Sequence, residues 1–203
     1  MYNAFFKRIL DFTLALLGFV ILSPIFIAIT ILLFFANEGK PFFIQLRPGK
    51  DERLFKIIKF KTMNDKKDDQ GNLLSDSKRL SKIGIFVRKT SLDEIPQLIN
   101  VLWGDMSFIG PRPLLIKYLP YYTGNELLRH SIRPGITGLA QVSGRNTLNW
   151  DERLALDVRY VENITLINDI TIILQSIKAV LFSKGVSLDP NALMKDLDDE
   201  RNN

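Results

Sequence analysis

The chain has 203 residues, enough for one domain with a core or one domain plus an anchor. Its net charge is +5 at pH 7, and this basic surplus suits an anionic partner such as nucleic acid, anionic lipid or a phosphorylated substrate. It contains no cysteine and one histidine, His130, which excludes disulfides, thiolate catalysis, Cys-ligated metal centres and multi-histidine metal sites. A Ser-His-Asp triad would need His130, and other chemistry must rest on carboxylates, lysines, arginines and hydroxyls.

An apolar segment near the N-terminus is the first predicted element. Residues 12–36 carry no charge, and a helix of 25 residues is long enough to cross a hydrocarbon layer of about 30 Å. A signal peptide would have a shorter apolar region followed by small residues, whereas Asn-Glu-Gly-Lys follows here. The pattern therefore predicts a membrane helix rather than a signal peptide or a buried core helix.

The middle of this segment is expected to break at Ser23 and Pro24, because proline removes a backbone hydrogen bond and clashes with the preceding turn. Lys7 and Arg8 precede the segment, and a larger basic group follows it. A helix that dips into the membrane and returns keeps both basic flanks in the cytoplasm, while a proline-kinked spanning helix is the alternative. We favour a re-entrant helix-break-helix over residues 1–40.

Residues 41–63 predict two strands joined by the turn PGKDE. Lys59 and Lys61 are two residues apart, so on a strand both side chains point to the same face. That pair fits a solvated edge strand protected by lysines as well as it fits a phosphate-binding patch. Residues 64–77 are polar and contain Gly71, which predicts a mobile loop.

Two adjacent carboxylates, Asp93 and Glu94, precede a helix predicted over residues 93–102. Ser91 with Glu94 fits a capping box, but Pro96 would then lie in the second turn. With Asp93 as the cap, Pro96 would lie at the third helical position, where its missing N–H costs nothing. Either way both carboxylates lie at a helix N-terminus, where they are simple caps or a catalytic pair.

Arginines in stiff or glycine-rich loops follow. Arg112 lies between two prolines, which suits either a rigid surface turn or a guanidinium that clamps a phosphate bidentately. Residues 133–146 contain Arg133, Arg145 and several glycines, which let a backbone approach a ligand closely or adopt a positive φ. Several such loops in one short chain favour a phosphate-bearing ligand.

The last predicted helix covers residues 166–182 and is amphipathic. Its apolar face contains Leu166, Ile170, Ile173, Leu174, Ile177 and Leu181. This face packs either against the core of the domain or against a membrane interface. The tail, residues 186–203, is polar and is expected to be solvated.

Taken together, the motifs KFKTM, RKTSLDEIPQLINVLWGDMSFIGPRP and RPGITGLAQVSGRN closely resemble the bacterial sugar transferase family, the monotopic phosphoglycosyl transferases. The resemblance extends from the apolar segment to about Arg159. The chain is similar to transferases that start protein N-glycan or O-antigen assembly. Lys61 stands where many relatives have arginine, which keeps the charge but loses the planar fork.

The resemblance implies an α+β, mostly helical fold: a re-entrant membrane helix, a small β-hairpin and amphipathic interfacial helices around a compact catalytic domain, residues 41–185. It also implies a monotopic protein of the bacterial cytoplasmic (inner) membrane, with its active site on the cytoplasmic face. Membrane lipids and downstream glycosyltransferases are then its expected partners.

The implied reaction transfers a sugar phosphate from a UDP-sugar to polyprenol (undecaprenyl) phosphate and releases UMP, with Mg²⁺ and a covalent phosphosugar–aspartate intermediate. UDP-N,N′-diacetylbacillosamine or another acetamido sugar is the donor that the resemblance suggests. Asp93 matches the nucleophile, and Glu94 matches a partner that binds metal or activates the acceptor. The expected phosphate-binding residues are Lys59, Lys61, Arg88, Arg112, Arg133 and Arg145, and the expected metal ligands are Asp93 and Glu94.

Two other functional classes fit the same residues. A membrane-associated phosphohydrolase would use the acids with water as acceptor, and a non-catalytic basic scaffold would use them only as helix caps. Nucleic acid is not an expected partner, because the basic residues lie near prolines, glycines and the anchor rather than along one helix.

Overall fold

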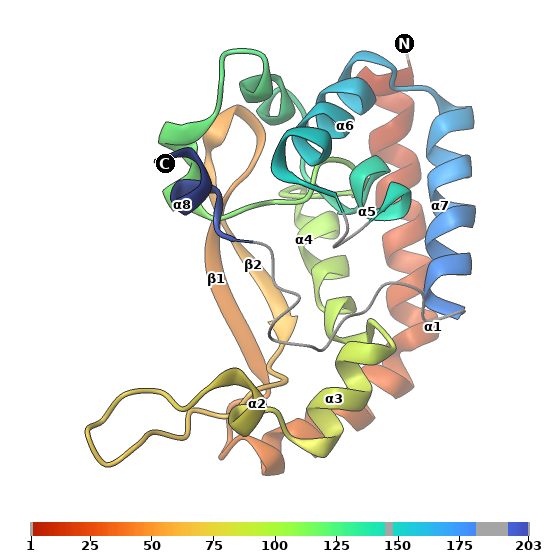
Figure 1. The fold of residues 1–203 in the computed structure, drawn as a ribbon. Coiled ribbons are helices and arrows are strands. Elements are labelled where there is room, and N and C mark those ends of the chain that lie inside the picture. Colours follow the sequence, from red (N-terminus) through yellow and green to blue (C-terminus); the bar gives the residue numbers. More distant parts are fainter. Residues whose placement is uncertain (1, 145–147, 182–194, 203) are drawn as a thin grey trace.

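The computed structural model describes residues 2–144, 148–181 and 195–202 (Figure 1). The helices and strands in chain order are a π-helical turn at Tyr2–Phe6, α1 Lys7–Ala36, β1 Phe42–Pro48, β2 Leu54–Phe60, α2 Asp76–Arg79, α3 Lys82–Lys89, α4 Gln97–Trp103, β3 Ser107–Ile109, β4 Gly135–Thr137, α5 Leu139–Ser143, α6 Trp150–Glu162, α7 Leu166–Leu181 and α8 Leu197–Arg201. Four 3₁₀ turns lie at Lys50–Glu52, Leu92–Glu94, Ile116–Tyr121 and Glu126–His130. The expected α+β, mostly helical fold is confirmed.

Helix α1 runs through Ser23 and Pro24 without interruption, so the predicted break between two helices is wrong in that form. Pro24 has no N–H to bond to the carbonyl of Val20, four residues earlier. The Ser23 hydroxyl donates to that same carbonyl at 2.7 Å. This bond satisfies the acceptor that proline leaves free, and the helix continues. Figure 1 shows the first half of α1 on the same side as α7 and the second half turning beneath α3.

The surface of α1 is mostly apolar and uncovered. Among the described helices, α1 alone is long and apolar enough to cross a membrane. One stripe, with Ala15, Ile29 and Leu33, packs into the same core as Phe55 and Ile57 of the hairpin. Phe19, Leu22 and Phe26 also pack against this core, but most other large apolar side chains of α1 stay exposed, which disfavours the buried core helix as an explanation for its composition. The shared core also means that the boundary predicted at residue 40 does not separate two packing units.

Buried polar contacts tie the start of α1 to the rest of the protein. Lys7 is buried, and its Nζ lies 2.6 Å from the carboxylate of Asp169 on α7. The Tyr160 hydroxyl donates to the other oxygen of Asp169 at 2.6 Å, and Asp11 accepts from the Ser107 hydroxyl at 2.7 Å. Lys7 is therefore half of an internal ion pair, not a free basic flank.

The predicted hairpin is confirmed. Strands β1 and β2 pair antiparallel, from Phe42 opposite Phe60 to Pro48 opposite Leu54. Helix α4 is fixed to β2 by the buried Asn100, whose Nδ2 donates to the Lys56 carbonyl at 2.8 Å and whose Oδ1 accepts from the Ile58 amide at 3.1 Å. These bonds set the residues before α4 against the same strand that carries Lys59.

Three glycines serve close packing of backbone on backbone. Gly110 follows β3, and Gly135 lies in β4, which pairs with β3 in parallel. A Cβ on Gly135 would lie 2.1 Å from the Gly110 amide nitrogen, and a Cβ on Gly138 would lie 2.2 Å from the Gly110 carbonyl oxygen. The glycines at 135 and 138 are therefore explained by this packing, which corrects the prediction that they bring the backbone close to a ligand.

Helix α7 leaves most of its predicted apolar face uncovered. Leu166, Ile170, Leu174 and Ile177 are exposed, while Asp169 and Ile172 face the domain and are buried. Packing of the whole apolar face against the core is therefore wrong. The exposed apolar residues leave the interfacial alternative open.

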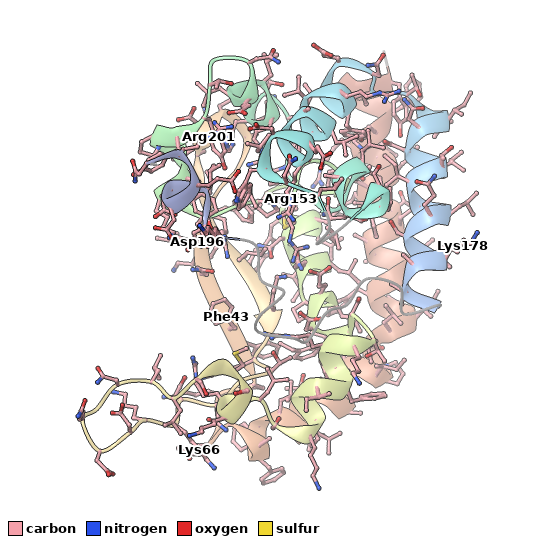
Figure 2. All side chains as sticks on the ribbon, in the orientation of Figure 1. Phe43, Lys66, Arg153, Lys178, Asp196 and Arg201 are labelled. Carbon is pink, nitrogen blue, oxygen red and sulfur yellow. The ribbon has the colours of Figure 1, made fainter. Side chains whose placement is uncertain are left out.

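The predicted solvated tail is wrong for residues 195–202. Leu197 of α8 is fully buried, and the Trp150 indole donates to the Lys195 carbonyl at 2.8 Å. Arg201 lies 2.6 Å from the Glu126 carboxylate (Figure 2). The buried leucine, the indole hydrogen bond and this ion pair hold α8 on the domain, while residues 186–194 of the predicted tail lie outside the described residues.

Candidate active site

The two adjacent carboxylates lie in the 3₁₀ turn Leu92–Glu94, just ahead of α4. Neither Ser91 nor Asp93 caps a helix with its side chain, because α4 begins only after Pro96. Both capping predictions are therefore wrong. Ser91 has a φ of +56°, a left-handed conformation that non-glycine residues adopt rarely and that is concentrated at functional sites.

Glu94 holds two cations with one oxygen. Its Oε1 lies 2.9 Å from Lys59 Nζ and 3.0 Å from Arg112 Nη2. Burial alone would raise the pKa of Glu94, but the positive charges of Arg112 and Lys59 outweigh burial and lower the pKa to about 2. Glu94 is therefore an ionised anchor for two basic side chains.

Asp93 is in a different state from its neighbour. Burial, and then the negative charge of Glu94, raise the pKa of Asp93 to about 6. Within the described part of the chain, the hydrogen bonds and ion pairs of the cluster engage Glu94 and leave the Asp93 carboxylate unengaged. Two neighbouring acids with pKa values moved in opposite directions indicate two different roles.

Both carboxylates line a cavity of about 1270 Å³. Eight basic and four acidic side chains of the described residues line it: Arg47, Lys59, Lys61, Arg79, Arg88, Arg112, Arg129 and Arg153 with Asp65, Asp93, Glu94 and Asp157. The predicted residues Lys59, Lys61, Arg88 and Arg112 are thus brought together around the acids, although Lys61 also pairs with Asp65. Arg145 lies outside the described residues. The excess of cations suits a ligand with several negative charges.

Arg133 is not at this cavity, which corrects its predicted role in phosphate binding. Its Nε donates to the Gly104 carbonyl at 2.7 Å, and Arg8 of α1 donates to the carbonyls of Val101 at 2.6 Å and Leu102 at 3.0 Å. Both guanidiniums therefore lie at the C-terminal end of α4, where free carbonyls and the helix dipole favour positive charge. The dyad lies at the opposite end of this helix.

Replacement of this capping arginine tests the correction. Arg133→Gln is expected to lower the free energy of unfolding by about 1 kcal/mol, because one charged contact at a helix end is lost, which corresponds to a Tm lower by roughly 2–4 °C. Thermal unfolding in detergent measures this change. Calorimetric titration with UDP should give Arg133→Gln the Kd of the wild type, whereas Arg112→Gln should raise the Kd of UDP. An equal rise in Kd in both variants would show that Arg133 belongs to the binding site.

His130 does not belong to the site. It is buried, and its Nδ1 lies 3.4 Å from the Gly49 carbonyl oxygen. Burial, helped by the charge of Arg129, lowers the pKa of His130 to about 4, so the ring stays neutral at pH 7. Its described polar contact is a carbonyl and not a serine or a carboxylate, which argues against a triad.

The sequence interpretation missed an internal ion pair in the wall of the cavity. Arg129 Nη2 lies 2.9 Å from the Asp157 carboxylate, and both side chains are almost fully buried. Arg129 also donates to the Arg112 carbonyl at 2.7 Å, so it positions the backbone of a cation in the dyad cluster. No local pattern links residues 28 positions apart; their contact depends on packing of the 3₁₀ turn Glu126–His130 against α6.

The donor set at the dyad fits Mg²⁺. This ion prefers oxygen ligands and is commonly bound by one or two carboxylates, with water and substrate phosphates completing its shell. Asp93 and Glu94 supply two carboxylates on consecutive residues at the cavity, and the Glu94 Oε2 takes part in neither ion pair. The site can thus hold a divalent cation only together with further ligands such as phosphate oxygens.

The chemistry open to this arrangement is attack on phosphorus. Asp93 is an unengaged carboxylate, a type of side chain that forms covalent phosphoryl intermediates. Glu94, the next residue, pairs with Lys59 and Arg112. These two cations can neutralise the charge of an incoming phosphate.

Comparisons with known proteins show the family of the chain. A model of the bacterial sugar transferase family matches residues 2–183. A Bacillus subtilis protein described as the uncharacterized sugar transferase EpsL is 45% identical over 181 residues, covering 89% of each chain. Two longer proteins are similar over much of this chain. The Salmonella typhimurium undecaprenyl-phosphate galactose phosphotransferase is 37% identical over 90% of this chain and 42% of its own length. The Klebsiella pneumoniae UDP-glucose:undecaprenyl-phosphate glucose-1-phosphate transferase is 35% identical over 84% of this chain and 39% of its own length.

Proposed function

The chain belongs to the bacterial sugar transferase family and is a phosphoglycosyl transferase, and we propose that it moves a sugar 1-phosphate from a UDP-sugar to undecaprenyl phosphate, with UMP as the second product. One observation carries the proposal: the unengaged Asp93 carboxylate lies beside Glu94, Lys59 and Arg112 in a cavity rich in cations. This is the first membrane step in assembling a glycoconjugate.

We propose two chemical steps. An oxygen of Asp93 attacks the β-phosphorus of the donor, the bond from that phosphorus to the bridging oxygen breaks, and UMP leaves. A phosphate oxygen of undecaprenyl phosphate then attacks the same phosphorus, and the bond to Asp93 breaks, which returns the free carboxylate. Mg²⁺, held by Asp93 and Glu94 with the diphosphate, would supply neutralisation of charge. Glu94 keeps Lys59 and Arg112 beside the reacting phosphate.

The covalent intermediate explains how two very different substrates can use one site in turn. The nucleotide sugar is soluble in water, whereas the acceptor phosphate stays in the headgroup layer of the membrane. UMP leaves before the lipid reacts, so the two substrates need not occupy the cavity together.

The sugar is the finer part of the proposal. The resemblance to small glycan-initiating transferases suggests a UDP-acetamido sugar such as UDP-N,N′-diacetylbacillosamine. The names of the Salmonella and Klebsiella relatives instead give galactose and glucose. A donor panel must therefore include UDP-galactose, UDP-glucose and UDP-acetamido sugars.

Release of UMP from this panel, with and without undecaprenyl phosphate, tests the function. We expect sustained UMP release, and a lipid-linked diphosphate sugar, only when the lipid is present. A phosphohydrolase would release sugar phosphate without lipid. A membrane scaffold would bind anionic vesicles and release no UMP from any donor.

We also propose a monotopic placement on the cytoplasmic face of the inner membrane, with α1 entering and leaving the same leaflet. Both ends of α1 contact the same domain: Lys7 pairs with Asp169 at one end, and the Asn37 side chain donates to the Lys61 carbonyl at 2.6 Å at the other. A straight spanning helix would place its ends on opposite faces, about 30 Å apart. The exposed apolar surfaces of α1 and α7 would then lie in lipid.

Labelling of single cysteines tests this topology with no background, because the chain has none of its own. Cysteines at Asn3 and Glu38 are each expected to react with an impermeant thiol reagent only after the cells are opened. Reaction at position 3 from outside intact cells, with position 38 still protected, would show a spanning helix and contradict the re-entrant course.

A further inference from the structure

Two arginines line the cavity at some remove from Asp93. Arg47 comes from β1 and Arg153 from α6, and both lie near Arg112 of the dyad cluster. The charge of Arg112, after burial, lowers the pKa of Arg47 and of Arg153. Figure 2 shows Arg153 near the centre of the view.

Arg47 has an unused donor. Its Nη2 donates to Gln45 Oε1 at 2.7 Å, but its Nε is buried and has no hydrogen-bond partner in the described chain. A buried N–H without an acceptor is destabilising, and more so on a charged group, so such donors are rare. The guanidinium is thus arranged to receive an acceptor that binds in the cavity.

The described lining of the cavity has more basic than acidic side chains. Two of its carboxylates are engaged, Asp157 by Arg129 at 2.9 Å and Glu94 by Lys59 and Arg112. Arg47 and Arg153 add two partly buried guanidiniums to this lining, and guanidinium is the side chain best matched to a phosphate.

Arg112 is the cation shared by the dyad and the two arginines. Its charge acts on Asp93 together with those of Lys59 and Arg88. It also acts on Arg47 and on Arg153, and all of these side chains line the same cavity. A diphosphate whose β-phosphorus lies at Asp93 needs cations for two phosphates, and this lining provides them.

We propose that Arg47 and Arg153, together with Arg112, bind the phosphate that leaves with the nucleotide. The inference rests on the proposed function, because it takes the β-phosphorus as the atom that Asp93 attacks. When the bond from that phosphorus to the bridging oxygen breaks, its electron pair stays on the oxygen, which becomes part of UMP. The leaving phosphate gains negative charge in this step, and the two guanidiniums stabilise that charge.

Binding of UMP to the full-length protein in detergent tests the assignment. Arg47→Gln and Arg153→Gln are each expected to raise the Kd of UMP, measured by calorimetry, by a factor of about ten or more. The matched controls are Arg53→Gln in the same hairpin and Arg159→Gln in α6, both at exposed positions, and each should bind UMP like the wild type. Uridine, which has no phosphate, should bind all five proteins alike.

A second readout uses the half-reaction that follows UMP release. Protein loaded with the phosphosugar and freed of UMP should transfer it to undecaprenyl phosphate at the wild-type rate in both variants. If thermal unfolding shows that a glutamine variant is unfolded, the lysine variant replaces it and should show a smaller rise in Kd. Wild-type affinity for UMP in folded Arg47→Gln and Arg153→Gln would overturn the assignment and leave the transferase proposal intact. A wild-type protein that releases no UMP from any donor and does not bind it would defeat both.

Discussion

Asp93→Asn is expected to lower the rate of UMP release by several orders of magnitude while the protein stays folded. Asparagine keeps the shape and size of the side chain but has no anionic oxygen to attack phosphorus. The structure leaves no capping role for Asp93 that the substitution could disturb. Thermal unfolding should therefore give a Tm close to that of the wild type, and a radiometric or coupled assay of UMP measures the rate.

The covalent step gives a direct check on this result. Incubation of the wild type with a UDP-sugar and Mg²⁺, without lipid, should add one phosphosugar to the peptide that contains Asp93, as seen by mass spectrometry. The Asp93→Asn protein should carry no adduct, and chelation of Mg²⁺ should prevent the adduct in the wild type. Asp51→Asn, at the exposed tip of the hairpin, is the control and should keep full activity. Full activity in folded Asp93→Asn, or an adduct at another residue, would rule out this nucleophile.

Arg129→Met is expected to lower the free energy of unfolding by about 3–5 kcal/mol, because it leaves the buried carboxylate of Asp157 without its partner. Burial already raises the pKa of Asp157, and the charge of Arg129 opposes that shift. Loss of the bond from Arg129 to the Arg112 carbonyl should also weaken donor binding. The Tm in detergent should fall by roughly 10 °C.

The double variant Arg129→Met with Asp157→Leu separates charge from packing. Removal of both charges leaves no unpaired ion, so the double variant should recover most of the lost stability. It should not recover donor affinity, because the Arg112 carbonyl still lacks its donor. Arg159→Met on the exposed side of α6 controls for the loss of a positive charge. A single variant as stable as the wild type would mean that this ion pair is not needed for the fold.

Local sequence determined the elements that carry the chemistry. The apolar composition of residues 12–36, the two strands around PGKDE and the adjacent acids before Pro96 depend on neighbours in the chain, and each lies where it was expected. The family motifs also identified four of the basic residues around the dyad, because these motifs run continuously along the chain.

Tertiary structure alone decided which charged side chains meet. Arg133 carries the same charge as Arg112, yet one lies at the end of α4 and the other at Glu94. Arg47 and Arg153 stand 106 positions apart and share one cavity only because β1 and α6 line it together.

The same reason explains the role of Asp93 and the position of the ends of the chain. Glu94 forms ion pairs with Lys59 and Arg112, whereas the Asp93 carboxylate stays unengaged. The sequence of two adjacent acids does not show which of them pairs. Lys7 pairs with Asp169, and α8 is held on the domain by Leu197. A charge acts over a few ångströms in space, so its partner is set by the packing of elements that lie far apart in the sequence.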